Sequence, residues 1–224
     1  MKPVLKICGL MRAEDVAACV AAGVDIAGFV CEYPVDVPWN LSREQAAALM
    51  SGVGAPVKRC LVTGGDFAKI YTLAAALRPD YVQLHYREDI AVTQALVHAL
   101  EPVGVRVIKT LPQDAACRRA QFGTDRLCEC VRMLDAVGVA YILCDARAPE
   151  NAAQTRLHAD AALYETVRDM ARTPVLLAGG ITPENAGELL SQVHPDGIDV
   201  MTGVEIRPGK KDAGKIAALA RLVR

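Results

Sequence analysis

The sequence has no excess charge and no long hydrophobic run, and each absence removes a class of partner. The formal net charge is -1 over 224 residues without a basic cluster, so nothing indicates binding to nucleic acid or to a membrane surface. The longest apolar stretches have strand length and are interrupted by charges, so no transmembrane helix is expected. Lys2 and Lys6 enclose only a Pro-Val-Leu segment, too short for the hydrophobic core of a signal peptide. We therefore expect a cytoplasmic protein.

The cysteines lack the spacing of a zinc site. The chain has eight cysteines but no CxxC pair, and Cys128-Glu129-Cys130 has no second pair at a suitable distance. Since no signal peptide is expected and the chain is long enough for a large core, reduced and mostly buried thiols are predicted instead of disulfides. No bound metal is expected.

Strand-like and helix-like segments alternate along the whole chain. The expected strands are short apolar runs at residues 4–8, 26–31, 57–62, 81–85, 105–109, 139–145, 175–178 and 198–201. The expected helices have apolar residues at helical spacing and lie at residues 13–22, 43–51, 67–77, 90–100, 115–137, 161–172, 183–192 and 211–223. This alternation predicts a parallel sheet covered by helices.

Two architectures fit such a pattern, a closed barrel and an open doubly wound sheet. Eight βα repeats without a linker favour the barrel, and no GxGxxG segment follows the first strand, as a dinucleotide-binding sheet would require. We therefore predict α/β class and a single (β/α)8 TIM barrel domain over residues 1–224. Reactive groups of such barrels lie where the strands end.

Glycines follow the seventh and eighth expected strands. Gly179 and Gly180 precede a helix, and Thr202 and Gly203 follow the last strand. Glycine allows close approach of a ligand to the backbone, and a helix N-terminus offers N–H groups to an anion. Loops at these two strands form the recurrent phosphate site of the fold, although ordinary turn glycines would give the same pattern.

Cys8 ends the first strand and is a candidate nucleophile, base or packing residue. Lys6 lies two positions earlier, on the same side of the strand, where an ammonium group would favour the thiolate. Lys6 could also form a buried ion pair with Asp199 on the eighth strand, which adjoins the first in a closed barrel. Both roles are compatible.

Asp145 ends the sixth strand after a largely apolar run. It is either a turn cap or the acid of an acid–base pair with Cys8. Gln83 and His85 alternate on the fourth strand, so both can point inward when Leu84 points toward the helices. His85 is either a ligand contact or a polar core residue.

The whole chain resembles the phosphoribosylanthranilate isomerase family. The resemblance is carried by the following segments in order: Lys6-Ile7-Cys8-Gly9, residues 23–30, Gln83-Leu84-His85, residues 177–180 with Pro183 and Asn185, residues 199–205, and Pro208-Gly209-Lys210-Lys211-Asp212. The terminal motifs are the specific ones, and the middle of the chain is less similar.

The resemblance implies an aldose–ketose isomerase of tryptophan biosynthesis that needs no cofactor or metal. Such enzymes carry out the Amadori rearrangement of N-(5-phosphoribosyl)anthranilate, a small phosphorylated substrate. By motif, Cys8 would be the base that removes the sugar C2 proton, and Asp145 the acid that protonates the ring oxygen. The glycine loops, with Thr202, would hold the phosphate. A monomer or a homodimer is expected.

Three departures from the family motifs fall in substrate-facing loops. Trp39 stands where the family has an arginine that holds the anthranilate carboxylate, and Arg43 or Arg147 could replace that arginine. The family's Gly-Gly-Thr-Gly loop reads Ala152-Ala153-Gln154-Thr155 here, and Tyr86 replaces a glycine. Alternatives are therefore a paralogous barrel that acts on, or only binds, another phosphorylated sugar adduct, and a sugar-phosphate epimerase.

Overall fold

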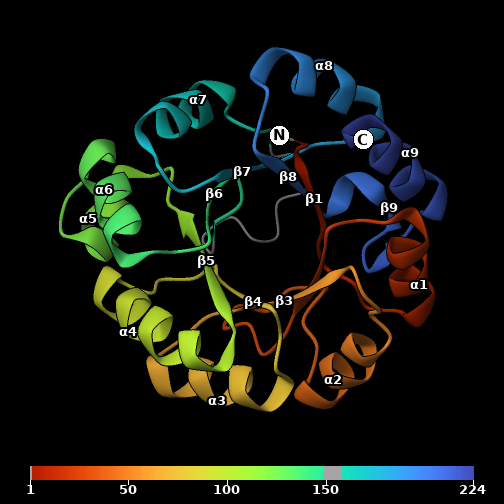
Figure 1. Cartoon of the computed structure of the whole chain (residues 1–224), viewed down its shortest axis with the longest axis horizontal. Helices are drawn as coiled ribbons and strands as arrows, with labels where there is room; N and C mark the ends of the chain where they lie inside the picture. The colour runs from red at the N-terminus through yellow and green to blue at the C-terminus, as the bar shows by residue number, and fades with distance from the viewer. Residues whose placement is uncertain (1, 149–157) are drawn as a thin grey trace.

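Eight parallel strands close into a barrel that a ring of helices surrounds (Figure 1). The computed structural model describes residues 2–148 and 158–224. The barrel strands are β1 Val4–Ile7, β2 Ile26–Val30, β3 Lys58–Thr63, β4 Tyr81–Leu84, β5 Arg106–Leu111, β6 Tyr141–Asp145, β7 Val175–Ala178 and β8 Gly197–Val200. Each strand pairs with the next, and β1 pairs with β8, which confirms the predicted fold.

The helices pack on the outside of the barrel. They are α1 Ala13–Ala22, α2 Arg43–Ser51, α3 Phe67–Leu77, α4 Ile90–Leu100, α5 Ala115–Phe122, α6 Leu127–Val137, α7 Ala161–Met170, α8 Pro183–Val193 and α9 Ala213–Val223. Two 3-10 turns, η1 Glu101–Val103 and η3 Thr202–Val204, and a hairpin of β9 Glu205–Arg207 and β10 Lys210–Lys211 complete the described elements.

Side chains of each strand alternate between two cores. Residues such as Val82 and Leu84 face the helices, whereas Val62 and Leu143 belong to a second cluster inside the barrel. This alternation follows from the period of two in a strand, and it explains why parallel strands read as nearly continuous apolar runs. It also places polar strand residues such as Lys6 and Gln83 inside the barrel.

Aspartate and serine side chains fix where many helices begin. Ser42 caps α2 with a capping box to Gln45, and five aspartates accept a backbone N–H at the start of the helix that follows them, namely Asp66, Asp89, Asp114, Asp160 and Asp212. Such caps satisfy N–H groups that have no partner within the helix. These six helices therefore begin at residues that the side-chain caps define.

Four predicted helices differ from the structure: α7 and α8 only in the residue at which they end, and the helices expected at 115–137 and 211–223 more substantially. The helix expected at 115–137 is two helices, because Gly123 adopts a left-handed conformation (φ 73°) and ends α5. The last helix begins at Ala213 instead of Lys211, because Asp212 caps it and Lys211 pairs with β9. The hairpin of β9 and β10 is absent from the predicted elements; the tight Pro208-Gly209 turn allows it, with Gly209 at φ 77°.

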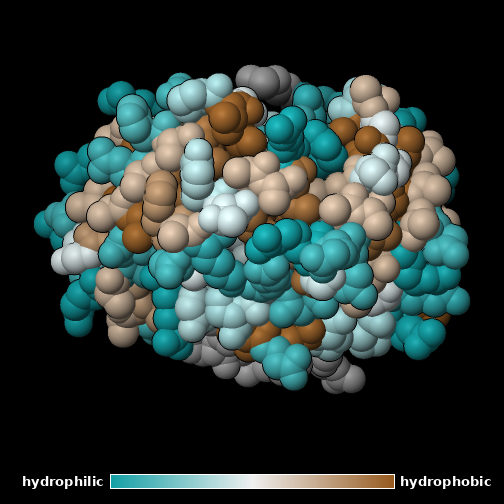
Figure 2. Space-filling model, turned by 90° about the horizontal axis from the view of Figure 1, so that it is seen from below, coloured by the Kyte–Doolittle hydropathy of each residue, from teal (hydrophilic) through white to brown (hydrophobic). Residues whose placement is uncertain are grey.

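The face of the molecule on which α2 and α3 lie has no single broad apolar area. Figure 2 shows hydrophobic residues in small patches separated by hydrophilic ones on this face. Within residues 2–148 and 158–224, none of the helices combines the length and apolar character needed to cross a bilayer.

Candidate active site

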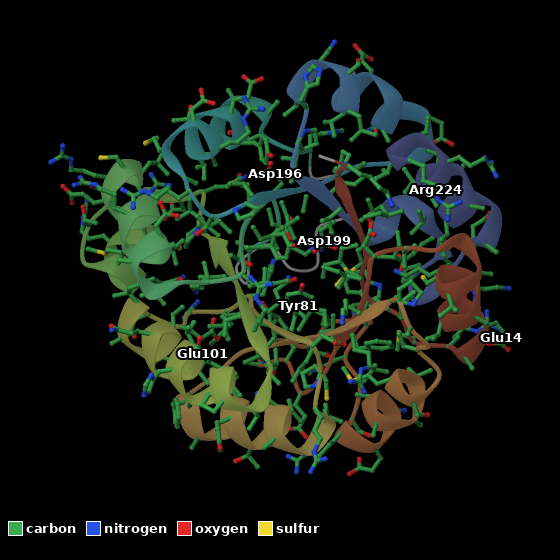
Figure 3. All side chains as sticks on the ribbon, in the orientation of Figure 1. Glu14, Tyr81, Glu101, Asp196, Asp199 and Arg224 are labelled. Atoms are coloured by element: carbon green, nitrogen blue, oxygen red, sulfur yellow. The ribbon has the colours of Figure 1, made fainter. Side chains whose placement is uncertain are left out.

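One cavity at the C-terminal end of the barrel collects the predicted site residues. It is lined by nine of them, all except Lys6: Cys8, Gln83, His85, Asp145, Gly179, Gly180, Asp199, Thr202 and Gly203. Figure 3 shows Asp199 inside the ring of strands, whereas Glu14, Glu101 and Arg224 lie among the outer helices. Residues from five strand ends therefore meet at one place, as the barrel geometry requires.

Lys6 and Asp199 form a buried ion pair beneath the cavity. The register of β1 and β8 places the two residues side by side, and Lys6 Nζ lies 2.6 Å from Asp199 Oδ2. Burial alone would lower the pKa of Lys6, but the Asp199 carboxylate, with Cys8 and Cys60, raises it above the usual value. Lys6 is therefore an ammonium group, and the predicted pairing with Asp199 is present.

Cys8 lies above this pair, immediately after β1. Gly28 on the neighbouring strand makes room for it, because a Cβ there would be 3.0 Å from Cys8 Sγ and 3.2 Å from Lys6 Nζ. Burial raises the pKa of the Cys8 thiol, Lys6 lowers it, and the Asp199 carboxylate raises it again, with a net upward shift. Lys6 thus favours the thiolate, in the direction predicted, but burial and the Asp199 carboxylate outweigh it, so the net shift of the Cys8 pKa is upward.

Asp145 is hydrogen-bonded to His85, a contact that is not among the predicted ones. Asp145 Oδ2 lies 2.9 Å from His85 Nε2, and Asp145 Oδ1 accepts the backbone N–H of Arg147 at 2.8 Å. Burial would raise the pKa of Asp145, but the hydrogen bond and charge of His85, with Arg147, lower it overall. The Asp145 carboxylate is therefore ionised and hydrogen-bonded to the His85 imidazole.

Two buried polar atoms of the cavity wall have no partner among the described residues. They are Gln83 Oε1 and Asp199 Oδ1. Gln83 is only 2% exposed, so water does not readily satisfy its amide. Unsatisfied buried acceptors are costly, and both atoms can accept hydrogen bonds from hydroxyl groups of a ligand.

The glycine loops after β7 and β8 interlock. Gly179 and Gly180 have φ values of 115° and 63°, which side chains rarely adopt. A Cβ on Gly203 would overlap the carbonyl oxygen of Ile181, so the β8 loop packs directly against the backbone of the β7 loop. Asn185 Nδ2 donates to Gly180 O at 2.9 Å and ties the β7 loop to the first turn of α8. Gly179, Gly180, Thr202 and Gly203 all line the cavity, so backbone of both loops borders it, as the predicted anion site requires.

We expect Gly203→Ala to weaken phosphate binding selectively. The added methyl must separate the β7 and β8 loops, and losing one charge-assisted hydrogen bond to phosphate raises the KM for a phosphorylated substrate about tenfold or more. Gly54→Ala is the matched control, because a Cβ at Gly54 meets nothing within 4 Å. Equal KM values for the two variants would show that the loops do not hold the phosphate.

The loop after β2 folds over the cavity. Tyr33 and Asn40 close its base, with Tyr33 N–H donating to Asn40 Oδ1 at 2.8 Å and Asn40 Nδ2 donating back to Tyr33 O at 3.0 Å. Tyr33 and Val37 line the cavity, and Tyr33 Oη donates to His85 O at 2.8 Å. Tyr33 and Val37 are not among the predicted site residues. The signal for them in the sequence is the alternation of apolar residues along this loop, which indicates that one side of the loop faces inward.

Two further departures from the family motifs are Tyr86 and the segment at residues 152–155. Tyr86 packs edge-on against Tyr33, with ring centroids 6.1 Å apart. The segment Ala152-Ala153-Gln154-Thr155 lies outside the described residues. Within the described part of the chain, no three His, Cys, Asp or Glu side chains are grouped to hold a metal ion.

These features define a class of protein: a TIM-barrel enzyme with a phosphate-type loop pair beside a thiol and a carboxyl group. The family model described as N-(5'phosphoribosyl)anthranilate (PRA) isomerase matches residues 5–221. The chain belongs to this family, an isomerase family of tryptophan biosynthesis, which confirms the predicted resemblance and enzyme class.

Individual relatives are similar to this chain over nearly their whole length. N-(5'-phosphoribosyl)anthranilate isomerase of Methanopyrus kandleri is 34% identical over 98% of this chain and 98% of its own. The crystal structure of phosphoribosyl anthranilate isomerase from Thermotoga maritima has a TM-score of 0.78 and 28% identity, covering 99% and 98% of the two chains. A phosphoribosyl anthranilate isomerase in complex with reduced 1-(o-carboxyphenylamino)-1-deoxyribulose 5-phosphate has a TM-score of 0.76 and 27% identity, with coverage of 99% and 98%.

Proposed function

We propose that this chain converts N-(5-phosphoribosyl)anthranilate into its 1-deoxyribulose isomer, with Cys8 as base and the His85–Asp145 pair as acid. The observation that carries the proposal is that Cys8, Asp145 and the two glycine loops line one cavity. A phosphate on the loops would hold the sugar between the thiol and the carboxyl group. Positioning of this kind lowers the entropic cost of both proton transfers.

The acid step opens the furanose ring. A proton shared by Asp145 and His85 passes to the ring oxygen, the bond from C1 to that oxygen breaks, and the anthranilate nitrogen and C1 form a protonated imine. Since the pKa of Asp145 is lowered, the carboxylate alone is a poor acid, and the imidazole 2.9 Å away supports a pair that acts together.

The base step removes the proton from C2. The Cys8 thiolate takes this proton, the electron pair moves into the C1–C2 bond and the imine nitrogen becomes neutral. Proton loss from the C2 hydroxyl and proton gain at C1 then give the ketose, so no proton is lost or gained overall. A raised pKa makes the Cys8 thiolate scarce but more basic, which suits removal of a proton from carbon.

Gln83 and Asp199 have supporting roles in this proposal. Gln83 Oε1 and Asp199 Oδ1 are acceptors without partners among the described residues, and they would take hydrogen bonds from sugar hydroxyls. Lys6 holds Asp199 in place. The reaction needs no cofactor, the location is cytoplasmic, and the assembly is a monomer or homodimer.

We expect the gene for this chain to restore growth of a tryptophan auxotroph that lacks this isomerase. The wild-type chain should permit growth without tryptophan, and the Cys8→Ala variant, expressed at the same level, should not. Absence of growth with the wild-type chain, despite folded protein in the cells, would instead favour a paralogue that acts on or only binds another phosphorylated sugar adduct.

A further inference from the structure

Among the described residues that line the cavity, Arg147 is the only arginine or lysine. It follows Asp145 by two positions, and its backbone N–H donates to Asp145 Oδ1 at 2.8 Å. The hydrogen bond therefore fixes the backbone of Arg147 relative to Asp145, which belongs to the proposed acid. Its guanidinium is the one permanent positive charge on the described cavity wall.

The side chain of Arg147 reaches from the end of β6 to the loop after β2. Its guanidinium carbon lies 5.3 Å from the centre of the Trp39 ring, a cation–π distance. Trp39 is 5% exposed, and its indole N–H donates to Glu205 Oε1 at 2.8 Å. Glu205 is in turn paired with Lys211 at 2.9 Å, so the ring that supports Arg147 is itself held firmly.

Arg43, the other arginine that could replace the missing one, is placed differently. Its guanidinium pairs with Glu32 at 3.4 Å at the start of α2, with 42% of the side chain exposed. It is not among the residues that line the cavity. Its guanidinium is therefore partly exposed, paired with Glu32 and outside the cavity.

We propose that Arg147 binds the carboxylate of the aryl group of the substrate and that Trp39 positions it. This inference rests on the proposed function, because it assumes an anthranilate adduct in the cavity. A guanidinium can hold a carboxylate through two parallel hydrogen bonds, and Tyr33 and Val37 give the aromatic ring an apolar wall. Trp39 and Arg147 thus replace the usual arginine of the loop after β2 by a charge that comes from the loop after β6.

Two stable ligands test this assignment without turnover. The first is the reduced form of 1-(o-carboxyphenylamino)-1-deoxyribulose 5-phosphate, and the second is the same compound with phenyl in place of carboxyphenyl. Arg147→Met should weaken binding of the first about 10- to 150-fold and leave the second within about threefold, as loss of hydrogen bonds to a charged group predicts. The dissociation constants are measured by isothermal titration calorimetry.

The control and the other outcomes separate the possible roles of Arg147. Arg43→Met should change neither dissociation constant. Equal weakening of both ligands by Arg147→Met would show that the arginine binds phosphate or only supports the site, and no change would show that it binds neither group. Either result would overturn the assignment while leaving the proposed reaction untouched, since that reaction is judged by turnover of the wild-type chain.

Trp39→Leu tests the positioning role. This variant should weaken the carboxylated ligand by less than Arg147→Met does, and it should leave the phenyl ligand unchanged. A fall in melting temperature together with equal weakening of both ligands would mean that Trp39 only packs the loop. In the Arg147→Met background, Trp39→Leu should have little further effect on the ratio of the two constants.

Discussion

Cys8→Ala is expected to lower kcat for N-(5-phosphoribosyl)anthranilate about 10²- to 10⁴-fold or more, the range that a positioned base contributes. The thiol is a cavity-lining group at the end of β1, and no other thiol lines the described part of the cavity wall. Alanine leaves the Lys6–Asp199 pair intact, so the variant should fold and bind the reduced product analogue. The rate is followed by the fluorescence of the anthranilate substrate.

Cys60→Ala is the matched control for this prediction. Cys60 is also buried inside the barrel, on β3, but it does not line the cavity. This variant should keep the wild-type kcat. Wild-type turnover by Cys8→Ala would show that another group removes the C2 proton.

The pH dependence of kcat/KM tests the role of Cys8 as the base. Burial raises the pKa of the Cys8 thiol, and only the thiolate is a base, so kcat/KM should increase with pH beyond neutrality until the thiol is deprotonated. An unchanged rate across that range would contradict a thiol base.

Asp145→Asn is expected to lower kcat by about 10²- to 10⁴-fold as well, because the His85–Asp145 pair that protonates the ring oxygen then loses its carboxyl group. Asparagine can still accept the Arg147 backbone N–H that Asp145 Oδ1 accepts, so the loop should keep its shape. Asp89→Asn is the control, since Asp89 caps α4 outside the cavity and asparagine caps a helix equally well. Equal kcat values for the two variants would exclude Asp145 from catalysis.

The His85–Asp145 pair makes a further distinction possible. If the two residues act as one acid, His85→Asn lowers kcat, and the double variant His85→Asn/Asp145→Asn loses no more than Asp145→Asn alone. Losses that multiply in the double variant would mean that His85 contacts the substrate independently of Asp145.

The architecture followed from the sequence because strand and helix periods differ and alternate along the chain. The helices at residues 13–22, 43–51, 67–77 and 90–100 have the predicted bounds, because apolar residues at helical spacing mark their extent. The Lys6–Asp199 pair could also be predicted, because closure of a barrel makes the first and last strands neighbours. Gly123 was read as a helical residue, although glycine often ends a helix, and so α5 and α6 were merged.

The electrostatics of the site could not be predicted from the sequence. Lys6 indicated a lowered pKa for Cys8, but the depth of burial and the proximity of Asp199 reverse the net shift. The His85–Asp145 bond joins residues 60 positions apart whose side chains needed a particular register and rotamer to meet. Likewise, the sequence offered both Arg43 and Arg147 as carboxylate ligands, and only the fold of the two loops distinguishes them.

The most direct test of the central claim is the initial rate at which the purified wild-type chain consumes N-(5-phosphoribosyl)anthranilate, followed by fluorescence. The double variant Cys8→Ala/Asp145→Asn, with binding of the reduced product analogue verified, is measured beside it. If the chain is an isomerase that uses Cys8 and Asp145, the wild-type chain turns over the substrate and the double variant shows no enzymatic rate. A wild-type chain that binds the analogue but leaves the substrate unchanged would contradict the claim.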